Sequence, residues 1–321
     1  MIETSATSDT SENSGPFETF EIALPHGVRL GCRAAGQIGR PVMMFIHGFP
    51  EGPFVWDALL THFSQPENGG YRCIAPALRG FAPSSAPAAV EAYGARLIVE
   101  DLAALIVALA PSPGAPLAAL VAHDWGGAVS WLLANQCPQL LDKLVVLNAP
   151  HAATLLRELR HNSAQQAASA YMNFLIRPDA ETLLAADDYR RLWRFFAVDG
   201  GDPPWLTAPL KAQYRAQWQQ GLTGPCNYYR ATPLRPARPG DPACESVVLP
   251  PATLNVTRPT LVIWGLEDTA LPPALIDGLE GFVADLTVRR VPGATHWIVH
   301  EQPEALAGWI GDFLQRPSAS P

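Results

Sequence analysis

The feature that most constrains the fold is an alternation of short apolar runs with longer helix-like stretches between Pro41 and Pro150. The run PVMMFI at 41–46 is apolar throughout, as a strand buried on both faces of a sheet should be. Helix-like stretches at 91–110 and 127–136 separate such runs. Because parallel strands need crossover connections, this order predicts right-handed β-α-β units and a mostly parallel sheet with helices on both faces.

The domain organisation follows from where this alternation stops. Two β-type runs at 19–24 and 28–34 predict an antiparallel entry to the sheet. After Pro150 the strand pattern disappears, and the chain becomes helix-like and rich in Trp and Tyr. Seven prolines from Pro233 to Pro259 follow, and they suit neither a helix interior nor a central strand. We therefore expect a disordered tail (residues 1–16), a core (17–150 and 250–321) and an inserted helical cap with a Pro-rich return loop (151–249).

The composition excludes several classes of partner. The 321 residues are 48% hydrophobic, which is enough for one large core. The 22 Lys and Arg against 30 Asp and Glu give a net charge of -8, and no basic block would suit nucleic acid or an anionic membrane surface. No apolar run approaches the ~20 residues that span a bilayer. The five cysteines form no CxxC pair, which indicates a reducing cytoplasm, and the sequence leaves a homodimer open.

The stretch AHDWG at 122–126 carries the first candidate catalytic residue. It lies where an apolar strand turns into a helix, and the small residues two positions either side of Asp124 leave room for a strained turn. This is the pattern of a nucleophile elbow with Asp in place of the usual Ser. On its own the pattern fits a second role equally well, because Asp commonly caps the helix that follows it.

Three further loops supply the other candidates. The turn HGFPEG at 47–52 follows one strand, Asp268 follows the run PTLVIWG, and His296 follows LTVRRV. Taken singly, an Asp or a His in a loop is usually structural. Together with Asp124, they give the chain order nucleophile, acid, histidine that the α/β-hydrolase fold uses. Each also lies past the carboxyl end of a predicted strand, where open α/β sheets bind ligands.

The segments HGFPE, AHDWGGAVSW, GLED and ATHW together resemble the epoxide hydrolase and haloalkane dehalogenase branch of the α/β-hydrolases. The resemblance covers residues 19–316 and implies an α/β-hydrolase fold with an eight-stranded, mostly parallel sheet and an inserted helical cap. It also implies that Asp124 attacks a substrate carbon to form an ester. His296, oriented by Asp268, would then activate the water that hydrolyses this ester.

The resemblance also implies the oxyanion and substrate-binding residues. Backbone N–H groups of Phe49 and Trp125 are expected to hold the negative oxygen that forms when the ester is hydrolysed. His47 and Pro50 belong to the same turn as Phe49 and are expected to complete this part of the site. Nothing in this chemistry requires a metal or an organic cofactor.

Two tyrosines of the expected cap favour an epoxide as the substrate. The segment NYYR resembles the NWYR segment of epoxide hydrolases and places Tyr229 as one proton donor, and Tyr171 in SAYMNFLIRPDAE resembles the other. A phenol with a pKa near 10 suits protonation of the alkoxide that an epoxide expels, whereas a halide leaves without a proton. Aromatic packing within the cap is the alternative role for both side chains.

The expected function is therefore hydrolysis of a small hydrophobic epoxide by water, to give a vicinal diol. Haloalkane or haloacid dehalogenation with the same nucleophile is the second choice. A binding protein without catalysis is the third, and it is disfavoured because Asp124 and His296 are both present.

Overall fold

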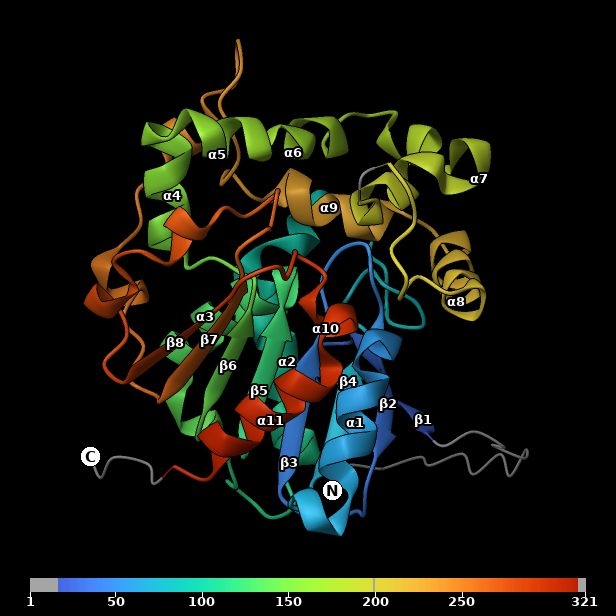
Figure 1. Cartoon of the computed structure of the whole chain (residues 1–321), viewed down its shortest axis with the longest axis vertical. Coiled ribbons are helices and arrows are strands. Elements are labelled where there is room, and N and C mark those ends of the chain that lie inside the picture. The colour runs from blue at the N-terminus through green and yellow to red at the C-terminus, as the bar shows by residue number, and fades with distance from the viewer. Residues whose placement is uncertain (1–16, 199, 317–321) are drawn as a thin grey trace.

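An eight-stranded sheet in the order β1-β2-β4-β3-β5-β6-β7-β8 runs through the centre of the protein (Figure 1). This computed structural model describes residues 17–198 and 200–316, so the tail predicted for residues 1–16 lies outside the described residues. The strands are β1 (Glu18–Ala23), β2 (Arg29–Ala35), β3 (Val42–Ile46), β4 (Arg72–Pro76), β5 (Ala119–His123), β6 (Leu144–Leu147), β7 (Thr260–Gly265) and β8 (Leu286–Val291). β2 pairs antiparallel with β1 and β4, and the other pairs in the sheet are parallel, which confirms the predicted topology.

Helices of the core cover both faces of the sheet. On one face lie α1 (Asp57–Ser64) and α11 (Pro303–Leu314), and on the other lie α2 (Ala95–Leu109) and α3 (Asp124–Gln136) (Figure 1). The short helix α10 (Ile298–Glu301) precedes α11. This two-sided cover is what the alternating sequence predicts.

Strand β3 shows why the central strands are apolar throughout. Met43 and Phe45 belong to the buried cluster under α1 and α11, whereas Met44 and Ile46 belong to the cluster under α2 and α3. Successive side chains of a strand point to opposite faces, so a strand covered on both sides needs apolar residues at every position.

The helix predicted over residues 91–110 differs in its first turn. Val90–Tyr93 forms a separate 3₁₀ turn, and α2 begins only after Gly94. Gly94 has an extended ψ of 137°, which interrupts the helical path. Glycine has a low helix propensity, so ending the helix at Gly94 costs little free energy. The 3₁₀ turn before it is held by the Tyr93 hydroxyl, which donates a hydrogen bond to the Pro87 carbonyl at 2.8 Å.

A set of helices is inserted between β6 and β7 and lies over the carboxyl ends of the parallel strands (Figure 1). The set consists of α4 (Ala152–His161), α5 (Ser163–Ala168), α6 (Ala170–Leu175), α7 (Ala180–Phe196), α8 (Ala208–Gln219) and α9 (Thr223–Ala231). Aromatic rings hold it together, with Tyr214 placed 4.9 Å from Phe196 and 5.4 Å from Trp218 between ring centres. Within residues 17–198 and 200–316, no helix combines the length and apolar character needed to cross a membrane.

The Pro-rich residues 232–259, called the return segment below, lead from α9 back to β7. Arg160 on α4 donates hydrogen bonds to the carbonyls of Cys244 at 3.0 Å and Val247 at 2.6 Å. Cys244 is buried against Leu156 and Leu159 of the same helix. These contacts attach the return segment to α4 and bring it beside the candidate site.

Candidate active site

Asp124 stands at the turn between β5 and α3, where the backbone is strained. Its φ is +50°, a left-handed value that residues other than glycine seldom adopt. Neighbouring glycines make the turn possible, because a Cβ on Gly126 would overlap the carbonyl oxygen of Ile46 and a Cβ on Gly48 would overlap the Asp124 carboxylate. The strained turn therefore presents the carboxylate of Asp124 directly to the loop that follows β3.

One oxygen of this carboxylate accepts a backbone hydrogen bond. The N–H of Phe49 donates to Asp124 Oδ1 at 2.6 Å. The N–H of Trp125 belongs to the first turn of α3, where no helix carbonyl lies four residues before it to accept a hydrogen bond. The positive end of the helix dipole adds to this environment. The arrangement can stabilise a negative charge on Oδ1, and it leaves Oδ2 for another role.

His296 follows β8 and is held by Asp268. Its Nδ1 donates to Asp268 Oδ2 at 2.7 Å. The side-chain amide of Asn148 donates to the same oxygen at 2.7 Å, and the backbone N–H groups of Ala270 and Leu271 donate to Oδ1 at 2.9 and 2.8 Å. With both carboxylate oxygens bonded, Asp268 fixes the orientation of the His296 ring.

The electrostatics of His296 favour its charged form. Burial on its own lowers the pKa of His296, but the charge and hydrogen bond of Asp268, with further attraction from Asp124 and Glu51, raise this pKa to about 9. The ring Nε2 lies 3.6 Å from Asp124 Oδ2, which is longer than a hydrogen bond but close enough for strong attraction. At neutral pH, an imidazolium thus stands between two carboxylates.

Sequence reasoning missed a buried hydrogen-bond network next to His296. Glu51 is fully buried, and its Oε1 accepts hydrogen bonds from the Tyr214 hydroxyl at 2.7 Å and from His300 Nε2 at 2.8 Å. Its Oε2 lies 3.2 Å from Nδ1 of His123, whose Nε2 donates to the backbone carbonyl of His296 at 2.8 Å. Burial alone would raise the pKa of Glu51, but the hydrogen bonds from His123 and His300 outweigh it and hold this pKa well below its usual range. The network contacts the backbone of His296 through His123, and it joins the core to α8 through Tyr214.

The two predicted tyrosines come together although they lie on separate inserted helices. Tyr171 is on α6 and Tyr229 is on α9, and their ring centres are 6.0 Å apart. Tyr229 also meets the Trp125 ring edge to face at 5.2 Å. Burial raises the pKa of both tyrosines, and the negative charge of Asp124 raises it further. Both phenols therefore keep their protons at neutral pH and can donate them.

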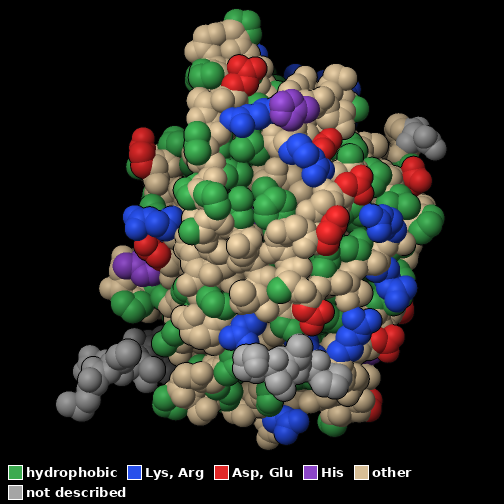
Figure 2. Space-filling model, turned by 90° about the vertical axis from the view of Figure 1, so that its left-hand side faces the viewer, with side chains coloured by type: hydrophobic (Ala, Val, Ile, Leu, Met, Phe, Trp, Pro, Cys, Tyr) green, Lys and Arg blue, Asp and Glu red, His purple; other side chains and the backbone are tan. Residues whose placement is uncertain are grey.

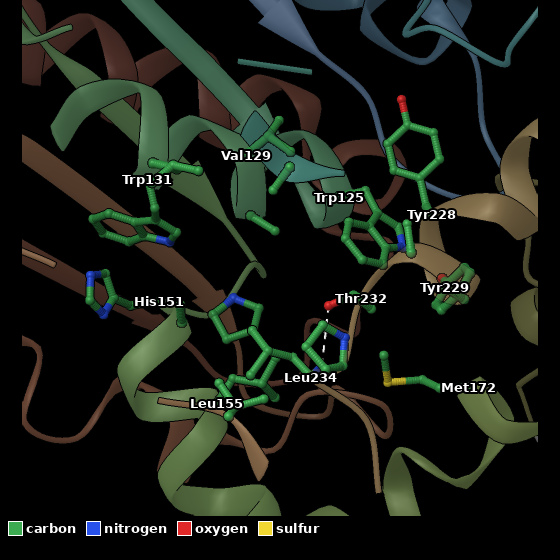
Figure 3. Close-up of a pocket in the computed structure, with 18 of the residues that line it drawn as sticks. Trp125, Val129, Trp131, His151, Leu155, Met172, Tyr228, Tyr229, Thr232 and Leu234 are labelled. Carbon is green, nitrogen blue, oxygen red and sulfur yellow. Dashed lines mark hydrogen bonds between the residues drawn. The ribbon is translucent and has the colours of Figure 1, made fainter. Parts of the chain in front are cut away.

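The neighbouring Tyr228 has a different role. Its hydroxyl donates to the carbonyl of Arg79 at 2.8 Å and points away from the other labelled side chains (Figure 3). Of the two adjacent tyrosines in NYYR, only Tyr229 keeps its hydroxyl for the site.

His47 and Pro50 hold the loop after β3 and do not line the cavity described below. The Nδ1 of His47 donates to the Gly48 carbonyl at 2.9 Å, and its Nε2 accepts from the N–H of Leu78 at 3.1 Å. Burial lowers the pKa of His47 to about 4, so the ring is neutral. The Pro50 carbonyl accepts from the indole N–H of Trp218 at 2.7 Å. These contacts fix the loop that holds the Phe49 N–H in place against Asp124.

A cavity of about 310 Å³ contains the candidate residues that could meet a substrate. Its lining includes Asp124, Trp125, Tyr171 and Tyr229. Trp125 and Tyr229 lie on the same side of the open space (Figure 3), and the Tyr171 and Tyr229 rings are in contact. This volume is at the lower end of what drug-sized ligands occupy. Among the residues described, no group of three or more His, Cys, Asp or Glu side chains is placed to hold a metal ion.

Comparison with known proteins agrees with this fold. Residues 41–303 match the family described as alpha/beta hydrolase fold. Epoxide hydrolase 3 of Mus musculus is 31% identical over 312 residues, which cover 93% of this chain and 78% of that protein. The AB hydrolase superfamily protein YfhM of Bacillus subtilis (strain 168) is 31% identical over 295 residues, covering 90% of this chain and 96% of that protein.

Among solved structures, an epoxide hydrolase of Bacillus megaterium in complex with an inhibitor superposes with a TM-score of 0.83. It is 29% identical, and the match covers 92% of this chain and 100% of that one. The chain belongs to the α/β-hydrolase family, in the branch that contains the epoxide hydrolases.

Proposed function

We propose that this protein is an epoxide hydrolase that adds water to an epoxide through a covalent ester on Asp124. The observation that carries the proposal is the placement of two proton-bearing tyrosines, Tyr171 and Tyr229, in the same cavity as the Asp124 carboxylate. A nucleophile and an acid that meet in one cavity are what ring opening requires. The similarity to named epoxide hydrolases supports the same activity.

In the first step, Asp124 Oδ2 attacks an epoxide carbon. We assign this oxygen because Oδ1 already accepts the Phe49 N–H, whereas Oδ2 faces His296 at 3.6 Å without a hydrogen bond between them. The carbon–oxygen bond of the ring breaks, and its electron pair goes to the epoxide oxygen, which takes a proton from Tyr171 or Tyr229. The product is an alkyl ester in which Oδ1 is the carbonyl oxygen.

Ester formation then changes His296 from a charged partner into a base. The attraction of Asp124 is one cause of the raised pKa of His296, and it disappears when the carboxylate becomes a neutral ester. The pKa of His296 therefore falls at the moment when a base is needed, and its proton restores the phenol that gave one up. The first step thus prepares the second.

In the second step, neutral His296 takes a proton from water, and the hydroxide attacks the carbonyl carbon of the Asp124 ester. The negative oxygen that results is Oδ1, to which the Phe49 N–H already donates, and the N–H of Trp125 in the first turn of α3 would be its second donor. Collapse of this intermediate expels the diol, which takes the proton from His296, and leaves a water oxygen in the Asp124 carboxylic acid. The proton of this acid then passes to His296, which restores the starting carboxylate and imidazolium. The sum is one epoxide and one water consumed for one diol.

The test is incubation of the purified chain with styrene oxide and, separately, with chlorobutane. We expect phenylethanediol from the first and no chloride release above background from the second, because the proposed donors in the cavity are the phenols of Tyr171 and Tyr229, which suit a leaving alkoxide. The Asp124→Asn variant is the control for contaminating activity. Chloride release without diol formation would assign a dehalogenase, and neither product from any epoxide tried would refute the proposal.

We further propose a cytoplasmic location, because all five cysteines are free thiols and a reducing compartment keeps them so. The homodimer stays a prediction, and sedimentation of the purified chain tests it.

A further inference from the structure

The cavity continues well beyond the catalytic end. Its far part, called the distal arm, is lined by side chains from α3, α4, the loop between β6 and α4, and the return segment. These side chains are Trp131, His151, Leu155, Val247, Leu249 and Leu254. In Figure 3, Trp131 and His151 lie on the opposite side of the open space from Trp125 and Tyr229. A substrate whose epoxide meets Asp124 would therefore extend its substituent toward the return segment.

The polar atoms of the distal arm already have partners. The indole N–H of Trp131 donates to the Ala149 carbonyl at 3.1 Å. His151 Nε2 donates to the Leu254 carbonyl at 2.9 Å, and Nδ1 accepts from the N–H of Ala153 at 3.3 Å. Burial lowers the pKa of His151, so this ring is neutral. The distal arm offers no free ring N–H to a polar substituent.

Among the described residues, the cavity wall also carries no Lys, Arg, Asp or Glu side chain apart from Asp124. A carboxylate or ammonium group placed in the distal arm would lose its hydration and gain no ionic partner. An alkyl or aryl group would instead remove apolar surface from water.

We propose that the distal arm selects epoxides that carry an extended, uncharged, apolar substituent, and that Leu155 and Leu249 set the length accepted. This inference rests on the proposed epoxide hydrolysis and names its substrate class. Both leucines are half-buried, and Leu249 is next in the chain to Val248, which is 87% exposed, so the arm nears the surface at this position. Figure 2 views the side of the molecule on which α4 lies, and it shows apolar side chains gathered over the upper half of that face.

The size of the effect follows from apolar transfer. Burying one methylene strengthens binding by about fourfold. A chain that fills the distal arm should therefore raise kcat/KM stepwise over a short chain, until the arm is full. A charged end group on the same chain should reverse the gain.

The experiment compares the terminal epoxides of butene and decene on the wild-type protein and on Leu249→Trp, which fills the distal arm. We expect Leu249→Trp to lower kcat/KM for the decene epoxide by about tenfold or more and to change that for the butene epoxide by less than about twofold. Val248→Trp is the matched control, because the adjacent side chain is exposed and does not line the cavity. Leu155→Trp repeats the test from α4 if Leu249→Trp does not fold.

Equal losses on both epoxides, or a wild-type protein that does not prefer the longer one, would overturn the proposal. A second arm uses the terminal epoxides of undecene and undecenoate, and equal kcat/KM for these two would overturn the selection against charge. If the wild-type protein opens no epoxide, the proposed activity fails. Calorimetric binding of decane diol then tests the distal arm independently of catalysis. Weaker binding by Leu249→Trp than by Val248→Trp supports the distal arm, and equal binding refutes it.

Discussion

His296 Nε2 lies 3.6 Å from Asp124 Oδ2, too far for a hydrogen bond and close enough for each charge to stabilise the other. This spacing couples the two steps of the proposed reaction, because the charge on Asp124 that raises the pKa of His296 disappears when the ester forms. The proposed nucleophile thereby controls the proposed base.

Replacing the nucleophile tests the covalent step. We expect Asp124→Asn to lower diol formation by at least about a thousandfold, because an amide cannot attack the epoxide carbon. The measurement is diol production by freshly purified variant whose mass confirms that the introduced amide has not deamidated. Turnover near the wild-type rate in such a sample would show that Asp124 is not the nucleophile.

His296→Gln should separate alkylation from hydrolysis. The attack of Asp124 on the epoxide carbon does not use His296 as a base, so the ester forms, whereas its hydrolysis slows by about a hundredfold to ten thousandfold without a base. Intact-mass spectrometry after mixing with styrene oxide should detect the protein with one substrate mass added. Rapid turnover with no adduct would contradict the assignment of His296 as the base.

Removing both phenols should cost more than removing either one. We expect Tyr171→Phe or Tyr229→Phe alone to lower the rate of ester formation by about tenfold and the double variant to lower it by about a thousandfold, since either hydroxyl can protonate the leaving oxygen. Stopped-flow tryptophan fluorescence follows the step. Tyr228→Phe is the control, because its hydroxyl bonds to the Arg79 carbonyl. Normal ring opening by the double variant would mean that the acid lies elsewhere.

The raised pKa of His296 predicts a dependence of stability on pH. Folding raises this pKa from 6.5 to about 9, so the folded state holds the proton more tightly than the unfolded state. The resulting stabilisation, up to about 3 kcal/mol, is fully present below pH 6.5 and is lost as the pH rises through about 9. Denaturant unfolding at several pH values should show this loss in the wild-type protein and a smaller one in His296→Gln. If the free energy of unfolding falls equally steeply with pH in both proteins, His296 does not make this contribution.

Glu51 should matter for stability as well as for the site. Glu51→Gln removes a buried charge that accepts from Tyr214 and His300, so we expect the free energy of unfolding to fall by roughly 3 kcal/mol. Glu67→Gln, at an exposed position, is the control and should change it by less than about 0.5 kcal/mol. Equal stability of the two variants would mean that the buried network contributes little.

The sequence predicts the sheet and the candidate triad because both follow from local patterns. Strands buried on two faces must be apolar at each position, and Asp124 and Asp268 each follow such a strand. His296 follows the parallel edge strand β8, whose Arg289 and Arg290 are exposed, so the topology brings all three residues to the carboxyl ends of the strands. The break at Gly94 was not predicted, since the flanking residues continue an amphipathic pattern across it.

The supporting residues could not be found in this way. Glu51, His123 and His300 lie far apart in the chain, and only folding brings them within hydrogen-bond range of one another. Asn148 follows β6 as the triad members follow their strands, and this position was the one available signal for it. The distal arm likewise depends on how the return segment packs against α4, which no local pattern specifies.

The oxygen atom that enters the diol tests the covalent pathway most directly. A single turnover is run in water enriched in heavy oxygen, with protein in excess over styrene oxide, and the diol and the peptide that contains Asp124 are analysed by mass spectrometry. We expect the first diol to carry no label and the Asp124 carboxylate to gain one, because the new oxygen of the diol comes from Asp124 Oδ2. Label in the first diol, with none in Asp124, would show that water attacks the epoxide directly.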